Sequence, residues 1–222
     1  MNTEQKAFHF FIMLLLSLIF SGCATNRSVL TITPPQSSPS MKADKAAFIK
    51  SITDNRSFMD KPPTPDIPSL GQGGIEKNDP ALIQRAVGRK RNGFGKAIGD
   101  VFLAEGTSVQ TMVRGSLETA LTDLGYTVYP EGANYPPDAI VLDVAINKYW
   151  SWIDMGFWSI GIEAEIDTDV RISSTAQTTR SIYARASERV MAATESAWQR
   201  VLEKVLAEYM NEAKIELSKI KQ

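Results

Sequence analysis

WSIGIEAEIDTDVRI, residues 158–172, carries the clearest secondary-structure signal in the chain. Apolar and polar residues alternate along it, which is typical of a β-strand with one buried face. The apolar residues occupy the even positions: Trp158, Ile160, Ile162, Ala164, Ile166, Val170 and Ile172. The odd positions carry the charged residues Glu163, Glu165, Asp167, Asp169 and Arg171, so that face is expected to meet solvent.

The segments on either side repeat this pattern. Residues 139–152 place Ile140, Leu142, Val144, Ile146, Trp150 and Trp152 on even positions, and residues 180–192 do the same with Ile182, Ala184, Ala186 and Val190. With turns near Met155 and Ala176, even residues pair with even residues throughout. The three segments therefore predict a meander whose apolar side chains all lie on one side.

Two helices are expected to cover that side. Residues 107–125 and 196–219 each carry apolar residues at three- and four-residue spacing, which indicates amphipathic helices. An earlier strand at residues 46–58 is expected to lie parallel to a meander strand after a crossover connection. The predicted fold class is α+β: a two-layer sandwich, with a mainly antiparallel sheet and two amphipathic helices packed on one face.

Two proline-rich segments interrupt these elements. Residues 60–106 are expected to form an irregular Pro/Gly-rich excursion, in which Asp79 and Pro80 begin a short helix. Residues 31–40 (TITPPQSSPS) are interpreted as a tether that holds the body off a membrane. Alternatively, the apolar residues just before the prolines, Val29, Leu30 and Ile32, form a short edge strand.

The start of the chain resembles the signal peptide of bacterial lipoproteins. Its apolar run, residues 7–20, is shorter than the roughly 20 residues that a membrane-spanning helix needs. Ser21 and Gly22 then precede Cys23, as in a lipobox, which implies that Cys23 is acylated and becomes the first residue of the mature chain. The alternative is an unmodified thiol after an ordinary cleavage site.

The same resemblance implies a location and a domain organisation. Ala24 stands where an aspartate would signal retention in the inner membrane, so the expected location is the outer membrane, facing the periplasm. We expect a signal peptide at residues 1–22, an acylated cysteine with a Pro/Ser-rich tether at 23–45, and a single α+β domain at 46–222.

Processing at Cys23 would remove His9, the only histidine, and leave an acylated Cys23 as the only cysteine. Catalysis that depends on an imidazole base, zinc sites built from His and Cys, and intrachain disulfides are then excluded. Lys and Arg total 24 against 25 Asp and Glu, which is not the charge excess of a nucleic-acid-binding protein. We expect no catalytic residue, no metal site, no cofactor and no nucleic-acid partner.

Several motifs together resemble the YajG family of outer-membrane lipoproteins. They are the lipobox, Asp54-Asn55-Arg56 at the end of the first strand, Leu124-Gly125-Tyr126 at the end of a helix, AIVLDVAI at residues 139–146, the charged alternating strand, Tyr183-Ala184-Arg185-Ala186 and the terminal helix. The likeness is concentrated in residues 107–219. It implies an anchor and a fold, and it supplies no catalytic residue.

Two segments are candidate binding surfaces. The run at residues 88–96 (GRKRNGFGK) concentrates cations around glycines and is a candidate anion-binding loop for lipopolysaccharide phosphates or peptidoglycan carboxylates, through Arg89, Lys90, Arg91 and Lys96. The hairpin at residues 149–158 (YWSWIDMGFW) is a candidate partner contact through Tyr149, Phe157 and Trp158. The alternatives are a solvated loop for the first segment and tryptophans that close the core against Trp198 for the second.

The acidic row at residues 163–169 is the best candidate for an enzyme. Alternate residues on a strand lie about 6.6–7 Å apart, which fits the roughly 6.5–9.5 Å carboxylate separation of inverting glycosidases. The predicted register instead places Asp167 opposite Arg185 and Glu163 opposite Arg189, in cross-strand ion pairs on a solvated face. A divalent cation bound by this row is a further alternative.

The expected function is a non-enzymatic, lipid-anchored binding or accessory module of the cell envelope. Its expected partners are the outer membrane and another envelope protein, lipopolysaccharide or peptidoglycan. The alternatives are a carboxylate-based hydrolase of cell-wall glycan and a structural subunit of a multimeric envelope complex.

Overall fold

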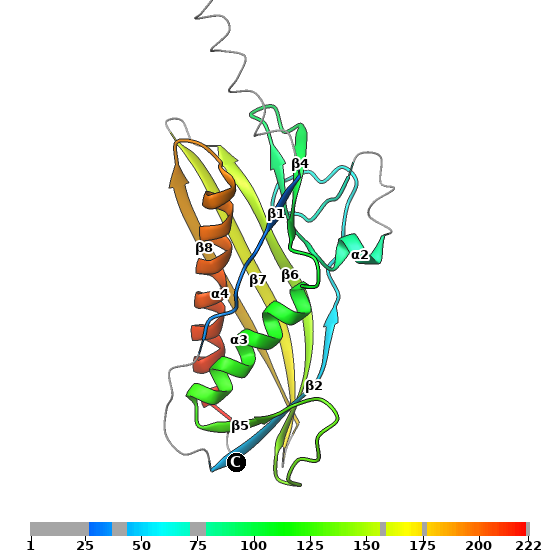
Figure 1. Cartoon of the computed structure of the whole chain (residues 1–222), viewed down its shortest axis with the longest axis vertical. Helices are drawn as coiled ribbons and strands as arrows, with labels where there is room; N and C mark the ends of the chain where they lie inside the picture. Colours follow the sequence, from blue (N-terminus) through cyan, green and yellow to red (C-terminus); the bar gives the residue numbers. More distant parts are fainter. Residues whose placement is uncertain (1–26, 37–43, 72–78, 156–158, 175–176, 221–222) are drawn as a thin grey trace, which may run out of the picture.

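The computed structural model describes residues 27–36, 44–71, 79–155, 159–174 and 177–220. They form a mixed sheet of eight strands, with two long helices lying along one side of it (Figure 1). In chain order the elements are β1 (Ser28–Leu30), β2 (Lys45–Asp54), α2 (Pro80–Ile83), β3 (Ala86–Arg91), β4 (Ala97–Leu103), α3 (Val109–Asp123), β5 (Tyr126–Tyr129), β6 (Ile140–Met155), β7 (Ile160–Ser173), β8 (Thr178–Val190) and α4 (Glu195–Ser218).

The long strand β6 organises the sheet. Antiparallel β7 pairs along one of its edges, and β8 pairs antiparallel with β7, which confirms the predicted meander. The other edge of β6 is shared by two parallel strands, β2 along its first half and β3 near its end. The α+β class and the parallel placement of the early strand are confirmed, but the sheet is mixed rather than simply a meander with one added strand.

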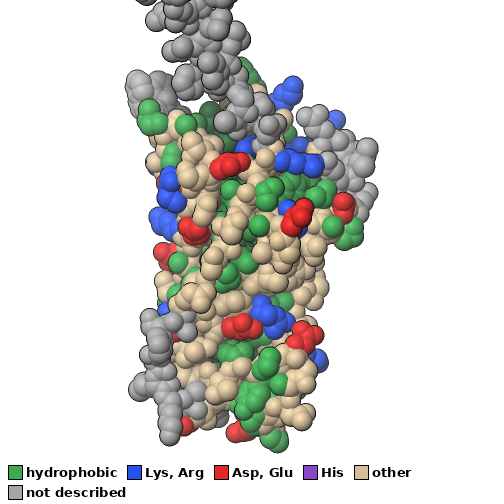
Figure 2. Space-filling model, in the orientation of Figure 1, with side chains coloured by type: hydrophobic (Ala, Val, Ile, Leu, Met, Phe, Trp, Pro, Cys, Tyr) green, Lys and Arg blue, Asp and Glu red, His purple; other side chains and the backbone are tan. Residues whose placement is uncertain are grey.

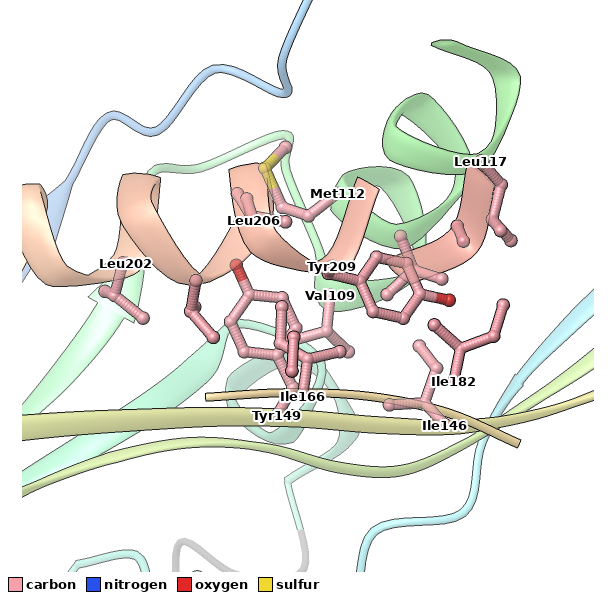
Figure 3. Packing of buried hydrophobic residues seen from close by; sticks show 14 of the residues in the cluster. Val109, Met112, Leu117, Ile146, Tyr149, Ile166, Ile182, Leu202, Leu206 and Tyr209 are labelled. Atoms are coloured by element: carbon pink, nitrogen blue, oxygen red, sulfur yellow. The ribbon is translucent and has the colours of Figure 1, made fainter. Parts of the chain in front are cut away.

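The main core lies between the sheet and the two long helices, α3 and α4. The even residues of β7 and β8 point into it as predicted, including Ile166 and Ile182. Figure 3 shows Val109 of α3 and Tyr209 of α4 close to Ile166 and Tyr149 of the strands, with Met112 of α3 beside Leu206 of α4. Burying so many large apolar side chains supplies the driving force for folding, at about 25 cal/mol per Å² of apolar surface.

A β-bulge in β6 overturns part of the predicted pattern. Ile146 pairs with Thr168 but Lys148 pairs with Asp167, so Asn147 is an extra residue in β6. Such an extra residue reverses the faces of every side chain that follows it. Before the bulge the even residues point into the main core, whereas after it Tyr149 does so.

The tryptophans after the bulge therefore lie on the opposite face of the sheet. Trp150 and Trp152 form a second, smaller core with Leu70, Ala86 and Phe102. The segment of residues 56–71 lies against this core: Trp150 Nε1 donates to the Pro65 carbonyl at 3.2 Å, and the Phe58 ring meets the Trp150 ring edge-on. The prediction of a single buried face was wrong at this end of the sheet.

The excursion predicted at residues 60–106 also contains regular structure. The short helix does begin at Pro80, with Asp79 as its N-cap, but it ends at Ile83. The antiparallel hairpin of β3 and β4 follows it. The strand β3 could not be recognised from the sequence. It is buried and its charges are paired inside the protein, so apolar and polar residues do not alternate along it.

Residues 31–36 of the segment interpreted as a tether belong to the folded body, and residues 37–40 lie outside the described residues. β1 pairs parallel with β4, and Leu30 and Ile32 are buried in the main core. Beyond them, Pro34 packs closely against Gly115 of α3, and the Pro35 carbonyl accepts a hydrogen bond from Thr119 Oγ1 at 2.8 Å. The edge-strand alternative is confirmed, because β1 joins the sheet ahead of residue 46.

Candidate functional site

One end of the molecule brings together several chain segments, at the top of Figure 1. We call it the hairpin end: the β3–β4 turn at residues 92–96, Asp154 and Met155 of β6, and Arg189, Val190 and Met191 at the end of β8. β3 runs parallel to β6, so the end of β3 and the end of β6 lie at the same end of the sheet. Met155 at the end of β6 pairs with Ile160, and Ile160 pairs with Val190, so the end of β8 lies there too.

A pocket of about 390 Å³ opens at the hairpin end. Its walls come from the proline-rich segment, the β3–β4 turn and the end of β6: Pro62, Pro63, Thr64, Pro65, Arg91, Asn92, Gly93, Gly95, Ile153, Asp154 and Met155. The pocket is shallow. Its lining combines apolar surface with one cation, Arg91, and one carboxylate, Asp154.

The β3–β4 turn is held in one conformation by Asn92. The Asn92 side chain accepts hydrogen bonds from the backbone N–H groups of Phe94 and Lys96, both at 3.0 Å. Gly95 has a φ of +75°, which glycine adopts without strain. The turn therefore presents Phe94 outward, with 97% of its surface exposed.

The predicted anion-binding loop is largely not a loop. Arg89 and Lys90 lie in β3 with buried side chains. Arg89 Nε lies 3.5 Å from Oδ1 of Asp100, and Asp100 is the residue of β4 that pairs with Arg89 across the hairpin. Lys90 Nζ donates to Ser28 Oγ at 2.7 Å. Because these two cations are used inside the protein, an exposed site made of all four predicted residues is not present.

The other two predicted cations remain at the surface. Lys96 is exposed and Arg91 is half-buried. Arg91 donates to the Gly95 carbonyl at 2.8 Å and to Ser69 Oγ at 3.1 Å, so it braces the turn against the proline-rich segment. Lys96 is therefore the residue of the four that is placed to meet an external anion.

Of the three residues of the predicted aromatic contact, Tyr149 is not available to a partner. Tyr149 is fully buried in the main core, because the bulge at Asn147 turns it inward. Phe157 and Trp158 lie outside the described residues. Sequence reasoning instead missed Phe94 and Met191, which are 97% and 86% exposed. The signal for Phe94 was a single large apolar residue in the middle of an Asn-Gly-Phe-Gly-Lys turn.

Tyr149 gives a prediction about stability. Its hydroxyl group has no hydrogen-bond partner among the described residues, whereas the equally buried Tyr209 shares a 2.8 Å hydrogen bond with Thr168. A buried polar group without a partner costs about 1–3 kcal/mol. We expect Tyr149→Phe to raise the free energy of unfolding by about 1 kcal/mol, and Tyr209→Phe to lower it by a similar amount. Urea denaturation of both variants checks this; a loss of stability in Tyr149→Phe contradicts it.

The acidic row lies on the outer face of β7 in a register different from the predicted one. Glu165, rather than Asp167, lies opposite Arg185, and Glu163 lies opposite Ser187. Arg185 reaches both carboxylates, with distances of 3.4 Å to Glu163 and 3.3 Å to Glu165. Both glutamates are buried, so the row is not the fully solvated face that was expected.

Lys148 completes this charged cluster. Its Nζ lies 2.6 Å from Glu165 and 5.2 Å from the centre of the Trp152 ring. Burial lowers the pKa of Lys148, but the hydrogen bonds and the negative charges of Glu165 and then Asp66 together outweigh burial and leave the pKa above its ordinary value. Both glutamates are thus held by cations, an arrangement that stabilises the sheet rather than exposing a carboxylate pair to substrate.

Burial raises the pKa of Asp167, and the neighbouring charge of Asp169 raises it further. Even so, Glu163, Glu165 and Asp167 do not line the pocket at the hairpin end.

Within the described ranges, no three His, Cys, Asp or Glu side chains converge in a way that could hold a metal ion. Over the same residues, no helix has the length and apolar character needed to cross a membrane.

Comparisons with known proteins give a fold. No family model and no curated protein matches the sequence. A solved Xanthomonas campestris protein of the DUF330 family aligns with a TM-score of 0.50 at 9% identity, over 86% of this chain and 94% of that one. The two chains share a fold. At this identity the likeness says nothing about function.

Other solved structures align less closely. An uncharacterised protein aligns with a TM-score of 0.48 at 10% identity, over 86% of this chain and 99% of its own. A minor lipoprotein from Acinetobacter baumannii has a TM-score of 0.31 at 14% identity, over 46% of this chain and 81% of its own. The neighbours thus include lipoproteins, while the resemblance to the YajG family stays a prediction.

Proposed function

We propose that this chain is a lipid-anchored lipoprotein of the outer membrane, facing the periplasm, that acts as a non-enzymatic binding or accessory module of the cell envelope. The observation that carries the proposal is Cys23, which follows Ser21-Gly22 and an apolar run and lies five residues before the first strand, β1. An acylated protein with several fatty chains is stably held by a bilayer.

The structure around β1 suits an anchored start. Ser28 is buried, accepts a hydrogen bond from Lys90 Nζ at 2.7 Å and donates one to Glu195 Oε1 at 2.7 Å. Further along β1, the Leu30 carbonyl accepts from the Ala104 N–H group at 2.9 Å. An anchor at Cys23 would therefore be joined almost directly to the folded body.

One observation favours a binding module over a glycan hydrolase, whose chemistry rests on a pair of carboxyl groups. The candidate pair, Glu163 and Glu165, is buried and shares Arg185 as a partner. A glycosidase needs one carboxylic acid able to give its proton to the leaving group, and carboxylates paired with cations are poorly suited to that role.

Lipid attachment is tested in cells by metabolic labelling with a palmitate analogue. We expect the full-length wild-type chain to be labelled and to fractionate with the outer membrane, whereas Cys23→Ala abolishes labelling. Ser21→Ala, which keeps a small residue before the cysteine, is the matched control and should be labelled like the wild type. Ala24→Asp should be labelled but move to the inner membrane. An unlabelled wild-type chain, or a labelled Cys23→Ala chain, would contradict the proposal.

A further inference from the structure

The reach of the anchor limits where a membrane can lie. Cys23 precedes Ser28 by five residues, and five residues span at most about 18 Å even when fully extended. Ser28 pairs with Val101 of β4. From Val101 back to Ala97 the strand rises about 14 Å toward the hairpin end, at about 3.4 Å per residue, and the turn with Phe94 lies beyond Ala97. The tip of the hairpin therefore reaches about as far as the anchor can.

The side chains at this end suit the boundary between lipid headgroups and acyl chains. Phe94 and Met191 are the two most exposed large hydrophobic residues that the structure describes, and Met155, 54% exposed, lies beside the β3–β4 turn, with its Cε 3.6 Å from where a Cβ of Gly93 would be. Single exposed hydrophobic residues are common on proteins. What distinguishes these three is that they occupy one end of the molecule, the end toward which β1 leads back (Figure 1).

The charges at the hairpin end are mainly positive. Lys96 is exposed beside Phe94, and Arg91 lines the pocket below it. Arg189 lies 3.6 Å from Asp154, and more than half of the side-chain surface of each is exposed. In the upper part of the visible face in Figure 2, Lys and Arg side chains lie among hydrophobic ones, and Asp and Glu side chains are present there too. Cations beside exposed apolar residues are the pattern that binds phospholipid surfaces.

We propose that the hairpin end rests on the membrane that holds the anchor, with Phe94, Met155 and Met191 entering the headgroup region and Lys96 meeting lipid phosphates. This proposal rests on the proposed function, because it needs an acylated Cys23. The body would then stand upright on the bilayer, with its long strands close to the membrane normal and the β5 end pointing away from it.

Fluorescence quenching in vesicles tests this contact. The lipidated protein is reconstituted in vesicles of phosphatidylethanolamine and phosphatidylglycerol that contain a lipid spin-labelled near its headgroup. A fluorophore is attached to Phe94→Cys, to Met191→Cys or to the control Ile215→Cys; Ile215 is half exposed near the far end of α4. Because Cys23 is the only natural cysteine and is acylated, the new thiol alone reacts. Thermal unfolding confirms that each variant folds.

We expect quenching at positions 94 and 191 to be several-fold stronger than at 215. Equal quenching at the three positions in acylated protein that floats with the vesicles overturns the membrane contact alone and leaves the hairpin end free for a protein partner. Mass spectrometry and flotation are done first: a chain without acyl groups at Cys23 overturns the proposed function, and this inference with it.

Discussion

Replacing Arg56 with alanine is expected to lower the free energy of unfolding by about 3–5 kcal/mol, the usual cost of breaking a buried ion pair. The Arg56 side chain is buried, and its Nε and Nη2 atoms each lie 2.8 Å from an oxygen of Asp54. Its Nη atoms also donate to three backbone carbonyls: Ala86 at 2.5 Å, Tyr149 at 3.1 Å and Ile83 at 2.7 Å. All five N–H donors of the guanidinium group are thus used.

The position of Arg56 explains why the loss should be large. β2 and β3 occupy the same edge of β6, and the last pair of β2 is Asp54 with Ile146, while the first pair of β3 is Gly88 with Ser151. Arg56 fills the gap between them and hydrogen-bonds carbonyls on β6, at the start of β3 and in α2. Its removal leaves Asp54 and several buried carbonyls without this partner.

Chemical denaturation of the wild type and three variants measures the effect. Arg56→Lys should recover only a small part of the loss, because an ammonium group cannot reproduce the planar fork. Arg200→Ala is the matched control: Arg200 is half exposed and pairs with Glu188 at 2.7 Å, so its loss should cost less than about 1 kcal/mol. If Arg56→Ala were no more destabilising than Arg200→Ala, Arg56 would not hold the strands together.

Gly88→Ala is expected to lower the free energy of unfolding by about 3 kcal/mol, at the upper end of the usual cost of overpacking. A Cβ atom at Gly88 would lie 2.3 Å from Ser151 Oγ and 2.8 Å from the Ser151 carbonyl oxygen. The hydroxyl group donates to the Val87 carbonyl at 2.6 Å, and the carbonyl belongs to β6 itself, so neither moves away without cost. The added methyl group pushes β3 off β6.

Thermal and chemical denaturation of a double-mutant cycle separates the two contacts. Ser151→Ala in the Gly88→Ala background should restore part of the stability, since it removes the closest atom but not the carbonyl. Gly93→Ala, in the same hairpin, is the control and should be nearly neutral, because its Cβ would meet only Met155 Cε at 3.6 Å. Wild-type stability in Gly88→Ala would show that β3 and β6 tolerate a wider separation.

The fold could be predicted where one periodic face packs against one core. Ile162 and Ile166 of β7 lie in the main core as their alternation indicates, and so does Trp198 of α4. The bulge at Asn147 could not be predicted, since an extra residue leaves no mark in the composition of the strand. The alternation in β6 therefore predicts that even residues before and after the bulge share one face. That prediction places Tyr149 and Trp150 on the wrong faces.

The candidate site was predicted less well, for a related reason. Whether a cation is solvated or buried depends on partners that only the fold supplies: Asp100 for Arg89, and Ser28 for Lys90. Neither partner is close to its cation in the sequence. Likewise, Pro34 and Pro35 suggested a tether, but the neighbouring residues of α3 give them a packing surface. The position of Cys23 could be interpreted because a lipobox is a local motif.

The parallel pairing of β1 with β4 has a mechanical consequence. A pull on fatty chains attached at Cys23 would act along the axis of β1, starting at Ser28. The strand would be drawn lengthwise past β4, so its cross-strand bonds and the contacts of Ser28 with Lys90 and Glu195 would carry the force together instead of opening one after another. A force applied through the lipid proposed at Cys23 would thus lift the whole body before it separated the first strand from the sheet.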